Sequence, residues 1–282
     1  MKTHILLLIL IIGFQNVGYA SSCFLASNEV DNIEALESEI HETIEFGSND
    51  QKMPGCEWLS RRWYFSYFNK LNPNIPLKKI PCERDQRSWS ENDKIAFRLA
   101  RAAYVLDETI FNRTSLPSTP LVSYGSISSP PASMLDWVAQ RSKSINIDKA
   151  ASYAYADVAN KQVHLTVADI NTNDLNDFGI GLAGQLIHEA RHIGTPSYGH
   201  RLCKGTADAY NCDPTITEEF QGGGSHAIAA LWLAWVAKKS KWPQAEKDKA
   251  EGVVTWVLKN RINDSFTVRN NFSLRYLGKP LR

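Results

Sequence analysis

Apolar residues recur at three- and four-residue intervals along most of the chain, the spacing that places them on one face of an α-helix. We therefore predict helices over residues 31–46, 57–70, 90–111, 133–140, 177–192, 225–238 and 243–262. The helix over 225–238 is apolar on nearly every side but too short to span a bilayer. We expect this helix at the centre of the core.

One stretch follows a different pattern, in which apolar and polar residues alternate. Residues 153–158 and 162–167 flank Ala159-Asn160-Lys161 and together predict a β-hairpin. An exposed strand of such a hairpin can pair with an extended peptide, or the hairpin can simply cover the core. The predicted fold class is therefore mainly α (α+β), with a small antiparallel hairpin just before the helix over 177–192.

A Ser- and Pro-rich stretch over residues 113–131 divides the chain. Its composition is typical of a linker or a long surface loop. It separates a helical N-terminal region, 21–112, from the region 132–282. The chain has 282 residues, enough for one large domain or two small ones, and we expect the two regions to form one compact domain.

The first 20 residues have the pattern of a secretory signal peptide. Lys2 and His4 precede an apolar run over residues 5–14, and a small-residue site ends at Ala20. The run is too short for a membrane span, so we expect cleavage near Ala20 and a secreted or periplasmic protein without a transmembrane segment. A lipoprotein acylated at Cys23 is the alternative.

Cysteine content is consistent with export. The chain contains Cys23, Cys56, Cys82, Cys203 and Cys212. In an oxidising compartment we expect pairs, with one cysteine left over. We predict the Cys203–Cys212 bond because it closes a short loop, and the spacing of the other three does not select a second pair.

Charge gives little indication of a polyanionic partner. The chain has 31 basic and 30 acidic side chains, and no run of five or more like charges. Proteins that bind nucleic acid carry a basic patch or an excess of positive charge. The composition therefore argues against nucleic acid as a partner.

Five residues carry the clearest chemical signal: His188-Glu189-Ala190-Arg191-His192, an H-E-x-x-H pattern. On a helix the two histidines lie one turn apart on the same face. Two imidazoles at that spacing can bind one Zn²⁺ at about 2.0–2.1 Å per bond. Glu189 lies roughly 100° around the helix, where it can act on a metal-bound water instead of binding the metal.

A catalytic zinc needs a third protein ligand and one open position for water. His200 is the first choice, because it follows the end of the helix and lies shortly before Cys203, whose disulfide would hold the ligand loop. The alternatives are Glu218 or Glu219, followed by Asp208 and His226.

The segment from Leu186 to Gly194 resembles the active-site helix of the zincin metallopeptidases. The resemblance implies a zinc-dependent peptidase in which Glu189 is the general base. It does not select a subfamily, because neither the metzincin nor the thermolysin-like pattern is matched in full. The group usually has uncharged residues between Glu and the second His, whereas this chain has Arg191, which we expect to orient a neighbouring acid or to hold a substrate carboxylate.

These observations predict an exported zinc metallopeptidase that hydrolyses protein or peptide substrates. Its zinc ligands would be His188, His192 and His200, with Glu189 as the catalytic residue. The alternative is a non-catalytic exported helical protein in which the H-E-x-x-H pattern is a structural metal site or a coincidence.

Overall fold

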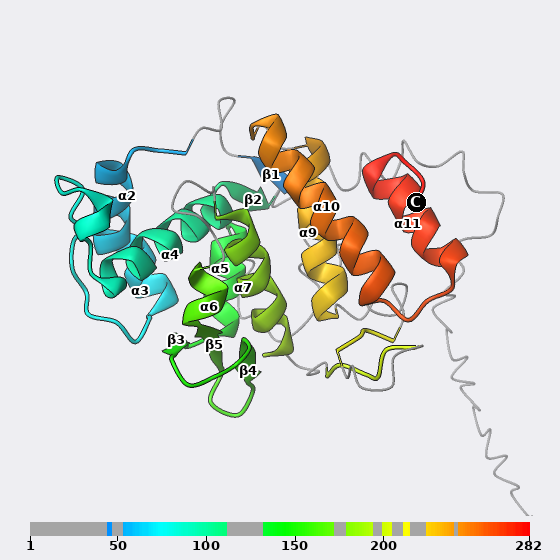
Figure 1. Ribbon diagram of the computed structural model, residues 1–282, viewed down its shortest axis with the longest axis horizontal. Coiled ribbons are helices and arrows are strands. Elements are labelled where there is room, and N and C mark those ends of the chain that lie inside the picture. Colours follow the sequence, from blue (N-terminus) through cyan, green and yellow to red (C-terminus); the bar gives the residue numbers. More distant parts are fainter. Residues whose placement is uncertain are drawn as a thin grey trace, which may run out of the picture.

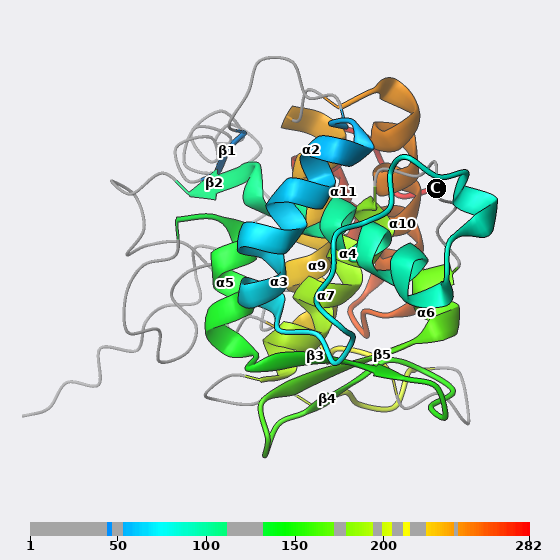
Figure 2. The ribbon, with the colours of Figure 1, turned by 90° about the vertical axis from the view of Figure 1, so that its left-hand side faces the viewer.

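The computed structural model describes residues 44–46, 53–111, 132–171, 179–193, 199–204, 211–214, 224–239 and 242–282. Within these ranges the protein is mainly helical with one small three-stranded mixed sheet, which confirms the predicted fold class. Figures 1 and 2 show the helices packed against one another, with this sheet across one end. The predicted signal peptide, Cys23 and the stretch 113–131 fall in the part of the chain that is not described.

The first described helices form one continuous rod. It consists of α2 (Cys56–Arg62), the π-helix η3 (Trp63–Tyr67) and α3 (Phe68–Leu71). Its buried apolar side chains recur every four residues, at Leu59, Trp63, Tyr67 and Leu71. Steps of four drift around a regular helix of 3.6 residues per turn, and the wider π turn offsets this drift. The helix predicted over 57–70 is confirmed.

A capping box begins α4 (Glu91–Asp107), which follows the short 3₁₀-helix η4 (Gln86–Ser88). The Ser90 hydroxyl accepts the Asp93 N–H at 3.3 Å, and the Asp93 carboxylate accepts the Ser90 N–H at 3.0 Å. Two backbone donors at the helix N-terminus are thereby satisfied. The predicted start of this helix is confirmed.

The predicted end of the same helix, near Phe111, is wrong. Strand β2 (Thr109–Phe111) follows α4 and pairs antiparallel with β1 (Ile44–Phe46). Each of the two strands contains β-branched residues, which favour an extended backbone. Residues 44–46 were predicted as the last turn of a helix, and the rest of that predicted helix lies outside the described residues.

The small sheet follows α5 (Met134–Arg141), the helix predicted over 133–140. It contains β3 (Ser144–Asp148), β4 (Tyr155–Asp157) and β5 (Gln162–Thr166), in the order β3-β5-β4. The antiparallel β4–β5 pair confirms the hairpin. The parallel pairing of β3 with β5 was not predicted, and the sheet leads directly into α6 (Val167–Asn171).

Helices α7 (Ile180–His192) and α9 (Ser225–Lys239) pack against each other at the centre of the molecule (Figure 1). The side chains of α9 from Ser225 to Val236 are buried, as predicted for this apolar helix. A Cβ at Gly184 of α7 would lie 3.6 Å from the Leu233 side chain of α9. The residue closest to Gly184 is therefore this leucine, whereas Gly181 is exposed.

Two C-terminal helices complete the described fold, where one was predicted. Helix α10 (Gln244–Asn260) begins after Pro243 and packs along α9, in agreement with the prediction over 243–262. Helix α11 (Phe266–Leu277) was not predicted, and its N-terminus is capped by the Ser265 hydroxyl, which accepts the Val268 N–H. Buried apolar residues between Leu59 and Leu281 form one core cluster.

Candidate metal site

Helix α7 places the two histidines of the H-E-x-x-H pattern one turn apart, near its C-terminal end. Their Nε2 atoms lie 3.3 Å from each other. Because i and i+4 residues share a face of a helix, both rings extend from the same side of α7. The pair predicted from spacing alone is therefore formed in the structure.

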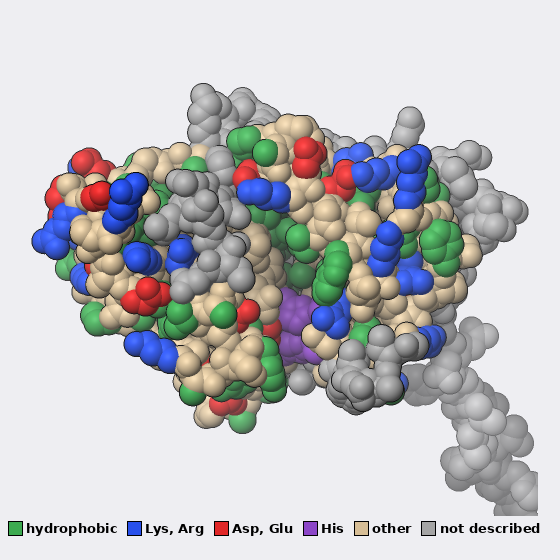
Figure 3. Space-filling model, in the orientation of Figure 1, with side chains coloured by type: hydrophobic (Ala, Val, Ile, Leu, Met, Phe, Trp, Pro, Cys, Tyr) green, Lys and Arg blue, Asp and Glu red, His purple; other side chains and the backbone are tan. Residues whose placement is uncertain are grey.

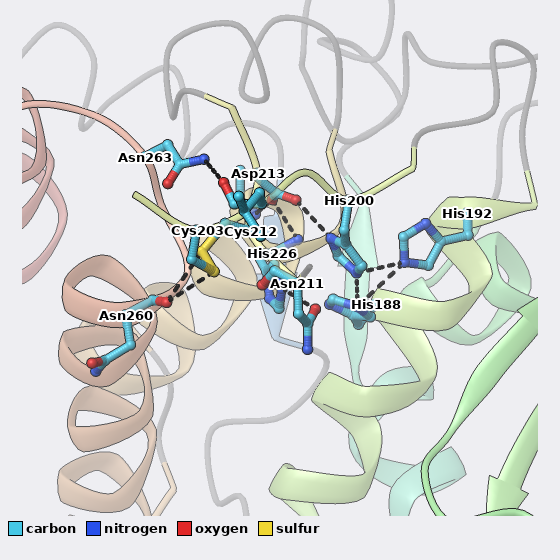
Figure 4. A network of polar contacts seen from close by, with 12 residues as sticks. His188, His192, His200, Cys203, Asn211, Cys212, Asp213, His226, Asn260 and Asn263 are labelled. Carbon is cyan, nitrogen blue, oxygen red and sulfur yellow. Dashed lines mark hydrogen bonds and ion pairs between the residues drawn. A yellow bond between two sulfur atoms is a disulfide. The ribbon is translucent and has the colours of Figure 1, made fainter. Parts of the chain in front are cut away.

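His200 comes from the described segment 199–204 and points at this pair (Figure 4). Its Nε2 atom lies 3.2 Å from Nε2 of His188 and 3.1 Å from Nε2 of His192. The residue chosen from the sequence as the third ligand is thus brought to the other two. Asp208, Glu218 and Glu219, the alternative ligands, lie outside the described residues.

The three Nε2 atoms form a nearly equilateral triangle with edges of 3.1–3.3 Å. A tetrahedral metal with bonds of about 2.0–2.1 Å separates its ligand atoms by about 3.3–3.4 Å. Three ring nitrogens cannot all satisfy one another by hydrogen bonds, because each pair needs one N–H and one lone pair. Their arrangement therefore suits a shared cation.

His226, from the first turn of α9, adds a fourth imidazole to the cluster. Its ring centroid lies 4.3 Å from that of His188 and 4.6 Å from that of His200. Ligand atoms of these three histidines lie within 4.8 Å of one another, so they form a second possible ligand set. Nε2 of His226 lies 3.2 Å from the Asn211 carbonyl oxygen, and when Nε2 donates there only Nδ1 of this ring remains to bind a metal.

Asp213 supports the cluster from behind, and the sequence analysis did not identify it. Its buried carboxylate places one oxygen 3.3 Å from Nδ1 of His200. The other oxygen accepts the backbone N–H groups of His226 at 2.8 Å and of Ala227 at 3.1 Å, at the N-terminus of α9. Asp213 therefore fixes the ring of His200, as carboxylates behind metal-binding histidines do, and ties it to α9.

The predicted Cys203–Cys212 disulfide is present and joins the segment of His200 to that of Asp213. Arg201 and Cys212 exchange two backbone hydrogen bonds, of 2.7 and 2.9 Å, beside it. A second disulfide joins Cys56 to Cys82, which resolves the choice that the sequence left open. Two disulfides are compatible with an extracellular or periplasmic protein. Among the described helices, none is both long and apolar enough to cross a membrane.

Glu189 is buried on α7, with only 4% of its surface exposed. Its carboxylate accepts the Gln185 side-chain N–H at 2.6 Å. A carboxylate oxygen lies within 4.8 Å of ring nitrogens of His188 and His192. Burial raises the pKa of Glu189 to about 8, Gln185 opposes this rise, and the negative charge of Asp169 adds to it.

This raised pKa predicts that the metal-free protein loses stability between pH 6.5 and 8. A carboxyl with a higher pKa when folded holds its proton longer in the folded state, so stability falls as the pH rises toward that pKa. Burial lowers the pKa of His188 and His226. Their effect is that stability increases with pH, but only up to pH 6.5, the ordinary pKa of histidine. Above pH 6.5 Glu189 dominates the pH dependence. At about 1.4 kcal/mol per unit, we expect the free energy of unfolding to fall by about 2 kcal/mol between pH 6.5 and 8.

Urea unfolding of chelator-treated protein across this pH range measures the decline. Glu189→Gln removes the titrating group, so its stability should stay constant from pH 6.5 to 8. An equal decline in the variant would assign the effect to another group.

Arg191 is fully buried beside Arg141, whose pKa is lowered to about 9 by burial and by the nearby positive charge of Arg191. A side chain without solvent exposure does not meet a substrate. Of the two roles considered for Arg191, the binding of a substrate carboxylate therefore does not agree with the structure.

No protein family model matches the chain, and no similar curated protein or solved structure was found.

Proposed function

We propose that the protein is a zinc metallopeptidase with His188, His192 and His200 as zinc ligands and Glu189 as general base. The observation that carries the proposal is the Nε2 triangle, with edges of 3.1–3.3 Å. Three imidazole nitrogens with a fourth position left for water are the ligand set of a catalytic zinc site. The resemblance of the H-E-x-x-H helix to that of zincins supports the same assignment.

The role of each residue follows from its position. When bound, zinc lowers the pKa of a water molecule and polarises the scissile carbonyl. Glu189 becomes ionised beside a divalent cation and accepts one proton from the attacking water, whose oxygen bonds to the carbonyl carbon. As the C–N bond breaks, Glu189 transfers that proton to the leaving nitrogen, and Gln185 holds its carboxylate in place at 2.6 Å.

Access to the site is consistent with a macromolecular substrate. Figure 3 shows histidine side chains at the surface, in a hollow between the sheet and the C-terminal helices. Strand β4 lies against α7 and, among the described strands, pairs on one side only. A strand edge beside the helix that carries His188 and His192 can hold an extended peptide by backbone hydrogen bonds.

The closeness of His226 favours one other candidate, a non-catalytic protein with a closed structural metal site. If His226 turned away from Asn211, four imidazoles would surround the metal and leave no position for water. Such a site would stabilise the fold without hydrolysing peptides.

Metal content and metal-dependent cleavage test the proposal together. We expect one zinc per purified chain by elemental analysis, and hydrolysis of a random peptide mixture followed by mass spectrometry. A chelator should abolish the cleavage, and one equivalent of zinc should restore it, because the metal supplies the water and polarises the carbonyl.

The failures of this test have different meanings. Bound zinc without cleavage of any peptide would favour the closed structural site. If the chain binds no zinc even after reconstitution, the proposed zinc site is wrong.

A further inference from the structure

Arg261 follows the last residue of α10 and lies next to the segment that supports the histidines. Its backbone C=O accepts the Asp213 N–H at 2.9 Å, and its own N–H donates to the Val257 C=O at 2.8 Å. Asp213 in turn contacts His200 at 3.3 Å. The backbone of Arg261 is thus hydrogen-bonded to Asp213, the residue that contacts the candidate metal ligand His200.

The side chain of Arg261 stacks on Trp256, with its guanidinium carbon 4.9 Å from the ring centroid. Trp256 is 49% exposed, so the pair stands at the surface. An indole face attracts the cation without using all of its N–H groups. The guanidinium is therefore oriented but can still donate hydrogen bonds to an anion.

The charge of Arg261 also acts on the histidine cluster. Burial is the largest cause of the lowered pKa values of His188 and His226, and the positive charge of Arg261 contributes to both. Within the described ranges, no carboxylate pairs with this guanidinium. Figure 3 shows basic and hydrophobic side chains on one side of the histidines, and acidic side chains on the other.

We propose that Arg261, oriented by Trp256, binds a carboxylate of the peptide substrate beside the metal site. This inference rests on the proposed peptidase function and names a substrate class for it. Arginine offers two parallel N–H donors, which match the two oxygens of a carboxylate. Trp256 and Val253, which is 44% exposed, add apolar surface for a neighbouring substrate side chain. The carboxylate is either the C-terminus of the peptide or an Asp or Glu side chain.

The test compares two random peptide mixtures, one with free and one with amidated C-termini, incubated with the zinc-loaded protein. Mass spectrometry then locates each cleaved bond. We expect the wild type to prefer a carboxylate at one fixed position relative to that bond by about tenfold or more, the usual effect of a charge-assisted hydrogen bond. Loss of the preference on amidation identifies the C-terminus, and its retention identifies Asp or Glu.

Arg261→Gln should lose the preference while keeping one zinc per chain and cleavage of neutral peptides. Arg261→Lys should keep part of it, because the charge remains but the paired donors do not. The matched control is Arg62→Gln, which removes another arginine stacked on an exposed tryptophan, Trp58, on α2. We expect this control to behave as the wild type.

Two outcomes would overturn the inference alone: zinc-dependent cleavage without any preference for carboxylates, or an equal preference in Arg261→Gln. Absence of zinc-dependent cleavage by the wild type would instead contradict the proposed function, and the inference would fall with it.

Discussion

Replacing Glu189 by glutamine is expected to abolish most peptide hydrolysis while leaving zinc bound. Glutamine has nearly the same shape and can keep a hydrogen bond to Gln185, but it cannot accept a proton from water. The loss of a positioned general base costs roughly 10²- to 10⁴-fold in rate. The measurements are the initial rate of zinc-dependent cleavage and the zinc content of the same preparation.

A second buried glutamate provides the control for this variant. Glu246 on α10 is 5% exposed and pairs with Lys249, away from the histidines. Glu246→Gln should retain wild-type cleavage at a temperature where the protein is folded. Should Glu189→Gln remain active within a few-fold of the wild type, Glu189 is not the base and the proposed mechanism is wrong.

Replacing His200 by alanine is expected to leave the protein unable to retain stoichiometric zinc. Two histidines on one helix remain, and a site with two protein ligands is incomplete. The affinity should fall by more than the roughly 10- to 100-fold that follows the loss of a partner behind a ligand. Zinc content after dialysis, and competition with a coloured chelator, measure the change.

His192 and His226 decide between the two possible ligand sets. If His188, His192 and His200 bind the metal, His192→Ala loses zinc and His226→Ala keeps it. The opposite result would assign the metal to His188, His200 and His226, whose ligand atoms lie within 4.8 Å of one another. Retention of full affinity by His200→Ala would exclude both sets.

Local sequence signals predicted α4 and α9 well, but they missed α11, although a serine caps its N-terminus too. The Ser90 and Asp93 side chains begin α4 as expected, and the apolar residues of α9 lie in the core. Contacts between segments that lie far apart in the sequence were harder to predict. Strand β3 is held partly by Asn74, whose side-chain oxygen accepts the Ile147 N–H at 2.7 Å. No local sequence pattern predicts this contact, because the two residues lie far apart in the sequence.

The candidate site shows the same division. A regular helix fixes the spacing of His188 and His192, so their sequence positions were sufficient. His200 was found because a short disulfide loop follows it. Asp213 was missed because its partners, His200 and the first turn of α9, are separated from it in sequence and meet it only in the folded chain. Its position directly after Cys212 was the one available sign.

The Cys203–Cys212 disulfide links the assembly of the metal site to the redox state of its surroundings. The bond joins the strand-like segments that carry His200 and Asp213, whereas the other two histidines depend only on α7. In a reducing cytoplasm the third ligand would lack this covalent tether, and the site would be incomplete. Under the proposed function, activity would thus begin only once this disulfide has formed, and hydrolysis would be held back wherever the cysteines stay reduced.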